Sequence, residues 1–160
     1  MLALKVDMKK LDNKDLQILE LLQEDCTISL QSLAEKVGLT QTPCYERVKK
    51  LRELGVIERY SAILRSSLLG YKHQAVLRVR VADEASNESV SIFESSVIAN
   101  KAVVKVLRIS SKFNYVINFR YKEIEDFFRF VEIMNKQAVV IDSEVVMVLE
   151  TLKDDQRVFF

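Results

Sequence analysis

The sequence predicts an α+β fold made of two small domains, because two kinds of hydrophobic pattern divide the chain. In the first third, apolar residues recur every three or four positions, as on one side of an amphipathic helix. From Lys72 onward, alternating apolar and polar residues typical of strands are interleaved with two further helical patterns. The change falls in a polar segment that ends near a glycine, residues 65–71, and we assign residues 1–64 and 72–160 to separate domains.

The first predicted helix begins after Asp12 and ends near Glu24. Asp12 is a suitable N-cap, and Asp15 lies where a negative charge favours the start of a helix. The expected core side of this helix consists of Leu16, Ile18, Leu19 and Leu22.

The second predicted helix covers residues 30–37, where apolar residues recur with helical spacing. Ser29 is positioned to cap its start. Gly38 follows its end and suits the left-handed conformation common there. The expected core residues are Leu30, Leu33, Ala34 and Val37.

The third predicted helix begins in Thr40-Gln41-Thr42-Pro43 and ends at Gly55, with either Thr40 or Thr42 as its cap. Its predicted core residues are Cys44, Val48 and Leu51, whereas Pro43, Arg47 and Lys50 form an outward flank. Two helices joined by a short glycine-containing turn, the second of them basic and polar at its tip, are typical of a helix-turn-helix whose second helix reads DNA.

The candidate DNA-binding surface is the tip and basic flank of this third helix. The net charge of the whole chain is only +1, which argues against a protein that coats nucleic acid by charge alone. Basic residues nevertheless outnumber acidic ones between Thr40 and Arg65, where a phosphate backbone would be met. Arg47 is predicted to bond two acceptors of a base or of a phosphate at once through its guanidinium. Arg47→Ala is therefore expected to weaken specific binding by about 1–3 kcal/mol. The full predicted set is Thr40, Gln41, Thr42, Pro43, Arg47, Lys49, Lys50 and Arg52.

Residues 56–64 are rich in β-branched and aromatic residues with partial alternation, which predicts two short strands or one bent strand. Beside a helix-turn-helix, such strands would form a wing. The N-terminal domain is therefore expected to be a winged helix-turn-helix.

The C-terminal domain has the predicted order β-α-β-β-α-β, the ferredoxin-like (ACT-like) plan with two helices on one face of an antiparallel sheet. Its elements are expected over 75–82, 86–98, 102–109, 113–119, 124–131 and 139–152. The covered sheet face should hold Leu77, Val79, Val81, Tyr115, Ile117 and Phe119. The other face, partly apolar and partly charged, is a candidate dimer surface. Phe127 and Phe128 are expected in the core, and Phe130 is the candidate interface residue.

No cofactor or metal site is predicted. Cys26 and Cys44 lack zinc-ligand spacing and are expected to be small buried or half-buried thiols. His73, the single histidine of the chain, is expected to be an ordinary surface or interface residue. The sequence contains no run long enough to span a membrane, and its charged start differs from a secretory signal, so we expect a cytoplasmic location.

These motifs resemble the Lrp/AsnC family, the feast/famine transcriptional regulators. Leu11-Asp12 with Asp15 and Ile18-Leu19 is similar to the opening LDxxDxxIL of the family. The stretch from Leu33 to Leu39 is similar to its second helix and turn, and the stretch from Thr42 to Ile57 to its recognition helix and exit. The resemblance implies a cytoplasmic, nucleoid-associated DNA-binding regulator that assembles into dimers or octamers. It also implies small effectors, commonly amino acids, bound at interfaces of the C-terminal domains.

The predicted effector hairpin departs from the family pattern. Where the family has a glycine and acidic residues, in the manner of G-D-F-D-Y, this chain has Ser111, Lys112, Phe113, Asn114 and Tyr115. A carboxylate would pair with an α-ammonium group, and none is present here. This argues against an amino acid and for either a different ligand, such as an anion, or no ligand. The tentative effector-binding residues are Ser110, Ser111, Lys112, Phe113 and Asn114.

The predicted function is a sequence-specific DNA-binding transcriptional regulator without enzymatic activity. One alternative is an effector-independent architectural protein that bends or bridges DNA, which the altered hairpin favours. A second is an enzyme similar to siroheme decarboxylases. Those enzymes use several histidines around a tetrapyrrole, whereas this chain has only His73.

Overall fold

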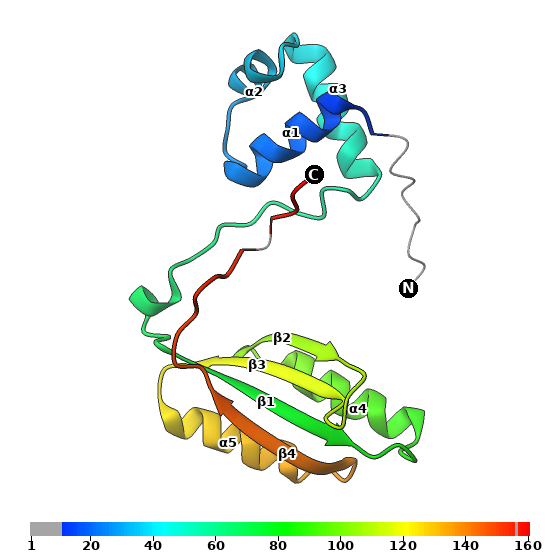
Figure 1. Cartoon of the computed structure of the whole chain (residues 1–160), viewed down its shortest axis with the longest axis vertical. Coiled ribbons are helices and arrows are strands. Elements are labelled where there is room, and N and C mark those ends of the chain that lie inside the picture. The colour runs from blue at the N-terminus through cyan, green and yellow to red at the C-terminus, as the bar shows by residue number, and fades with distance from the viewer. Residues whose placement is uncertain (1–10, 156) are drawn as a thin grey trace. The chain divides into compact units, whose positions relative to one another are not determined.

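The computed structural model describes residues 11–155 and 157–160, which form two compact units (Figure 1). One unit comprises the described residues up to Ile63 together with those from Asp155 onward, and the other comprises Leu64–Asp154. The charged start that we distinguished from a secretory signal lies mostly outside the described residues. Among the described residues, no helix is both long and apolar enough to cross a membrane.

The first unit is built from the three predicted helices. Asp12 accepts hydrogen bonds from the backbone N–H groups of Lys14 and Asp15, and the Asp15 carboxylate accepts one from Asp12, which completes a capping box. Ser29 caps the second helix, as predicted. Thr40 precedes the third helix, although its side chain makes no capping hydrogen bond. The helices are α1 (Asn13–Glu24), α2 (Leu30–Val37) and α3 (Gln41–Glu53).

The core of the first unit lies where the three helices meet. Gly38 has a φ of +65° and ends α2 in the left-handed conformation, which turns the chain toward α3. Cys44 and Leu51 place one side of α3 in this core. The buried apolar residues are Ile18, Leu19, Leu33, Ala34, Val37, Cys44 and Leu51.

The strands that we predicted over residues 56–64 are absent. Val56 and Ile57 pack against the helical core, but Ile63 and Leu64 are 99% and 66% exposed. A strand requires a partner for its backbone hydrogen bonds, and no strand of the described chain pairs with this segment. The expected wing is therefore an extended connection, followed by a short 3-10 helix, η2 (Ser66–Leu69), within the predicted linker.

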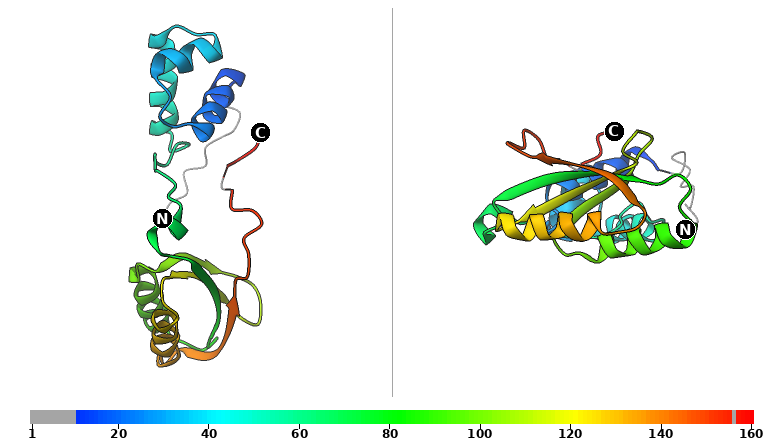
Figure 2. Two further views of the ribbon diagram at one scale, coloured as in Figure 1. Left: turned by 90° about the vertical axis from the view of Figure 1, so that its left-hand side faces the viewer. Right: turned by 90° about the horizontal axis from the view of Figure 1, so that it is seen from below.

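The second unit has the predicted βαββαβ order. Its antiparallel sheet has the strand order β2-β3-β1-β4, and α4 and α5 lie side by side on one face (Figures 1 and 2). Leu77, Ile117 and Phe127 lie in the core between the sheet and the helices. The opposite face of the sheet is not covered by any described element of this unit. The elements are β1 (His73–Val81), α4 (Asn87–Ala99), β2 (Val103–Arg108), β3 (Tyr115–Tyr121), α5 (Ile124–Asn135) and β4 (Val140–Met147).

The alternation along β1 and β3 confirms the predicted covered face, but two other predictions are wrong. Phe130 is buried, whereas Phe128 is 60% exposed, because the core side of α5 follows Phe127, Phe130 and Met134. Because three phenylalanines occur within four positions, the sequence alone did not show which of them continue the helical spacing. The last strand is also shorter than expected, since it ends at Met147, where its pairing with β1 ends.

Candidate nucleic-acid interface

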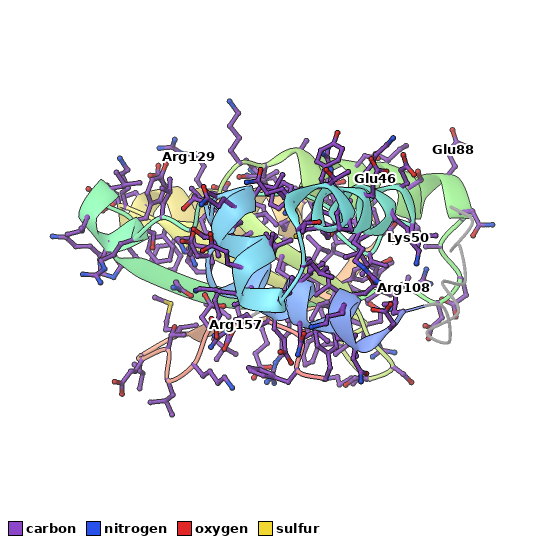
Figure 3. All side chains as sticks on the ribbon, turned by 90° about the horizontal axis from the view of Figure 1, so that it is seen from above. Glu46, Lys50, Glu88, Arg108, Arg129 and Arg157 are labelled. Atoms are coloured by element: carbon purple, nitrogen blue, oxygen red, sulfur yellow. The ribbon has the colours of Figure 1, made fainter. Side chains whose placement is uncertain are left out.

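The first turn and the outer side of α3 form the candidate nucleic-acid interface. Gln41, Thr42 and Pro43 are all exposed at its N-terminus. Lys49, Lys50 and Arg52 are exposed further along the same helix. Glu46 and Lys50 both extend from α3 (Figure 3). Because the opposite side of α3 is held in the core, the polar tip and the lysines face solvent.

Arg47 differs from its neighbours on α3 because it is bound to two carboxylates of α1. Its Nη1 atom donates to Asp12 Oδ2 and to Asp15 Oδ1, both at 2.7 Å. The bonds to Asp12 and Asp15 raise the pKa of the Arg47 guanidinium. The pKa of Asp12 is lowered by the backbone N–H of Asp15 and by Arg47. The side chain of Arg47 is 29% exposed, so the predicted outward flank is partly turned toward α1.

The start of α1 contacts both other helices, through Asp15 to α3 and through Lys14 to α2. The side chain of Asp15 is 1% exposed, and the Nζ atom of Lys50 lies 3.7 Å from its second oxygen. Lys14 Nζ donates to the backbone carbonyl of Val37 at the C-terminal end of α2, where a cation is favoured. The orientation of α3 is thus set by charged contacts as well as by apolar packing.

Two exposed residues of α3 were missed by the sequence-based prediction. Tyr45 is 52% exposed, and Glu46 beside it is exposed as well. With Thr42 and Lys49 they follow the spacing i, i+3, i+4 and i+7, which places all four on one side of a helix. The same spacing rule that located the core side could therefore have located them.

The predicted effector hairpin joins β2 to β3, and two of its side chains have structural partners. Asn114 donates to the carbonyl of Val81 at 2.9 Å and accepts from its N–H at 2.8 Å, which ties the hairpin to β1. Lys112 lies 3.2 Å from the Asp142 carboxylate of β4. Lys112, where the resemblance implied an acidic residue, therefore forms an ion pair within the fold.

Within the described residues, no group of three or more histidine, cysteine or acidic side chains is arranged to hold a metal ion. His73 stacks on Tyr121, with ring centroids 5.4 Å apart. Cys44 is buried, and its burial raises the pKa of the thiol. Cys26 is exposed, so the prediction that both thiols are at least half-buried was wrong. It follows the end of α1, outside the apolar stripe.

Comparison with known proteins places this interface in a family. Residues 11–52, which contain α1, α2 and nearly all of α3, match the AsnC-type helix-turn-helix domain. The chain is 31% identical to the proline dehydrogenase transcriptional activator of Rhizobium radiobacter, over 90% of this chain and 92% of that protein. The chain belongs to the Lrp/AsnC family of transcriptional regulators. This Lrp/AsnC protein is accordingly a DNA-binding transcriptional regulator.

Solved structures extend the family likeness over both units. An AsnC family regulator from Agrobacterium tumefaciens matches with a TM-score of 0.86 and 30% identity, over 92% of this chain and 96% of that one. A regulator from Neisseria meningitidis, solved with L-methionine, matches with a TM-score of 0.85 and 26% identity, over 91% and 94% of the two chains. The α+β architecture of this Lrp/AsnC protein is therefore the one that its relatives share.

Proposed function

We propose that this regulator binds operator DNA as a homodimer, with the first turn of α3 in the major groove. The observation that carries the proposal is the exposed tip of α3, on a helix whose other sides are held by the core and by Asp15. In the proposal, residues 1–64 form the DNA-binding domain, and residues 72–160 form the oligomerisation and effector domain.

The residues of α3 have different proposed roles. Gln41 and Thr42 read base edges, because an amide and a hydroxyl each offer a donor and an acceptor to a base pair. Lys49, Lys50 and Arg52 contact phosphates, which position the helix on the duplex. Thr40 and Pro43 line the entry to the groove. Arg47 keeps its predicted DNA contact through Nε and Nη2, while Nη1 is held by Asp12 and Asp15.

The proposed roles can be separated by measuring binding to operators selected from a random DNA library. Gln41→Ala should weaken operator binding by about 1–3 kcal/mol and relax the selected sequence at one position. Lys49→Gln should weaken binding to all sequences. It should also reduce the slope of the logarithm of affinity against the logarithm of salt concentration by about one, because one phosphate contact fewer releases counterions. Lys136→Gln, in the second unit, is the matched charge control and should bind as the wild type does. Unchanged affinity and salt dependence in both α3 variants would reject this binding mode.

The proposed dimer forms through the uncovered sheet face. The face is amphipathic: the register places Val76, Val116 and Val146 on it, beside the ion pair of Arg78 with Glu144 at 3.1 Å. It also carries Arg120 by strand alternation, and the Nε atom of Arg120 is buried without an acceptor among the described residues. A second copy would cover the valines and could supply that acceptor. An octamer would need further contacts between such dimers.

We further propose a non-catalytic regulator, located in the cytoplasm with the nucleoid, whose binding responds to a small molecule. The Neisseria relative solved with L-methionine supports an effector in this family architecture. The hairpin residues Ser110–Asn114 remain the predicted contact for it. Since Asn114 and Lys112 are already bonded within the fold, an effector there would have to rely on the remaining side chains and on backbone groups.

A further inference from the structure

A groove lies in the second unit, away from the hairpin. It has a volume of about 350 Å³ and is bordered by the turn before β2, the end of β3 and α5. The hairpin precedes the first residue of β3, whereas the groove lies along its last three residues. The two sites are therefore at opposite ends of the same strand. The side chains that matter for the argument are Tyr71, Lys101, Lys122, Asp126, Arg129 and Ile133.

The groove carries a surplus of positive charge. Lys101 comes from the turn before β2, Lys122 from the bend that follows β3 and Arg129 from α5, whereas Asp126 is the only acidic residue among the described residues of the lining. None of the ion pairs found among the described residues includes any of these four side chains. Arg129 extends from α5 (Figure 3). Arg120 of β3 also lines the groove, so four cations lie there, and none of them has a carboxylate partner among the described residues.

The same groove has an apolar side. Phe119 and Phe130 lie beneath it with their rings stacked, the centroids 4.6 Å apart and the planes at 23°. Both rings are at most 3% exposed, so the base of the groove is part of the rigid core. Ile133 is 50% exposed at the rim, and the Tyr71 ring lies 4.7 Å from Lys122 Nζ. A ligand would therefore meet the cations together with the partly exposed apolar side chains of Tyr71 and Ile133.

We propose that this groove binds a small organic anion, with a carboxylate or phosphate group attached to a short apolar body. The guanidinium of Arg129 can bond two oxygens of such a group, and the lysines add point charges. The volume is within the range of small-molecule sites. The regulatory meaning of this site rests on the proposed function, whereas ligand binding itself does not depend on α3. The site supplies an anion-responsive input in a protein whose hairpin, residues 110–114, contains no acidic residue.

The test is calorimetric titration of the full-length protein at low ionic strength with phenylacetate and with inorganic phosphate. The wild type should bind phenylacetate saturably and more tightly than phosphate, because only phenylacetate also covers the apolar side. The double variant Lys101→Gln/Arg129→Gln should bind phenylacetate at least tenfold more weakly. The control Lys105→Gln/Lys136→Gln removes the same charge from this unit outside the groove and should bind as the wild type does.

Two outcomes would overturn the assignment: no saturable binding of phenylacetate, or equal binding by the groove variant and the wild type. A third arm uses a short duplex of random sequence. If the groove variant loses affinity for that duplex and keeps its affinity for phenylacetate, the cations contact DNA phosphates and not a small anion, and the proposal fails. Operator binding measured on the same proteins reports separately on α3, since the groove variant should retain it while Lys49→Gln does not.

Discussion

At the scale of single residues, Asp15 does more than its position in the sequence indicated. Its carboxylate accepts from the N–H of Asp12 at 3.2 Å and from Arg47 at 2.7 Å. One buried side chain therefore completes the capping box of α1 and orients α3. Arg47 in turn has a structural role that is independent of its predicted DNA contact.

Replacing Asp15 by asparagine should lower the free energy of unfolding by about 1–3 kcal/mol, because a buried charge-assisted hydrogen bond is lost. The new amide nitrogen is itself a donor, and in either orientation it would face another donor, the Asp12 N–H or the Arg47 guanidinium. Urea denaturation measures the change. Glu132→Gln breaks an exposed pair with Lys136 on α5 and should leave the midpoint unchanged. Equal midpoints for Asp15→Asn and the wild type would show that the contact is not stabilising.

At the scale of elements, the turn between α2 and α3 depends on the backbone of Gly38. A Cβ atom there would lie 3.6 Å from Lys14 Nζ, which is ordinary contact, so space alone does not require glycine. The φ of +65° does, since a side chain strains that conformation.

Gly38→Ala should therefore lower the free energy of unfolding by about 1 kcal/mol. Gly38→Asn should lower it less, because asparagine tolerates the left-handed conformation better than alanine. Chemical denaturation of the three proteins checks this order. Should alanine and asparagine prove equally stable, backbone strain would not explain the glycine.

At the scale of the whole molecule, the proposed dimer would hold two α3 helices on the DNA together, so we expect assembly and operator affinity to be coupled. Val116→Lys places a charge in the middle of the uncovered sheet face and should convert the dimer into monomers. Operator affinity should fall by at least about a hundredfold. Light scattering gives the mass, and a mobility-shift assay gives the affinity.

The control for assembly is Ile92→Lys on α4. Ile92 is 59% exposed and lies on a helix that covers the opposite face of the sheet, so the dimer should persist. A Val116→Lys protein that keeps the wild-type mass would place the dimer contact elsewhere.

The caps, the turn glycine and the element order were predictable from the sequence, because each depends on residues a few positions apart. Asp12, Ser29 and Gly38 act on their own helix ends, and helical or alternating spacing marks the faces of most elements. The tip of α3 was found in the same way. The prediction of a wing was wrong because it depended on residues far apart in the sequence. β-branched residues favour a strand, but a strand forms only where a partner strand supplies its backbone hydrogen bonds.

Contacts between residues that are far apart in the sequence were decided only by the tertiary structure. Arg47 meets Asp12 and Asp15 across 35 and 32 positions, and no local pattern indicates that pairing. The choice between Phe128 and Phe130 depended on how α5 rotates against the sheet. The cationic groove exists because a turn, a strand end and a helix converge. Local sequence thus determined the elements and the helix that we propose reads DNA, while packing decided which charged side chains are paired within the fold.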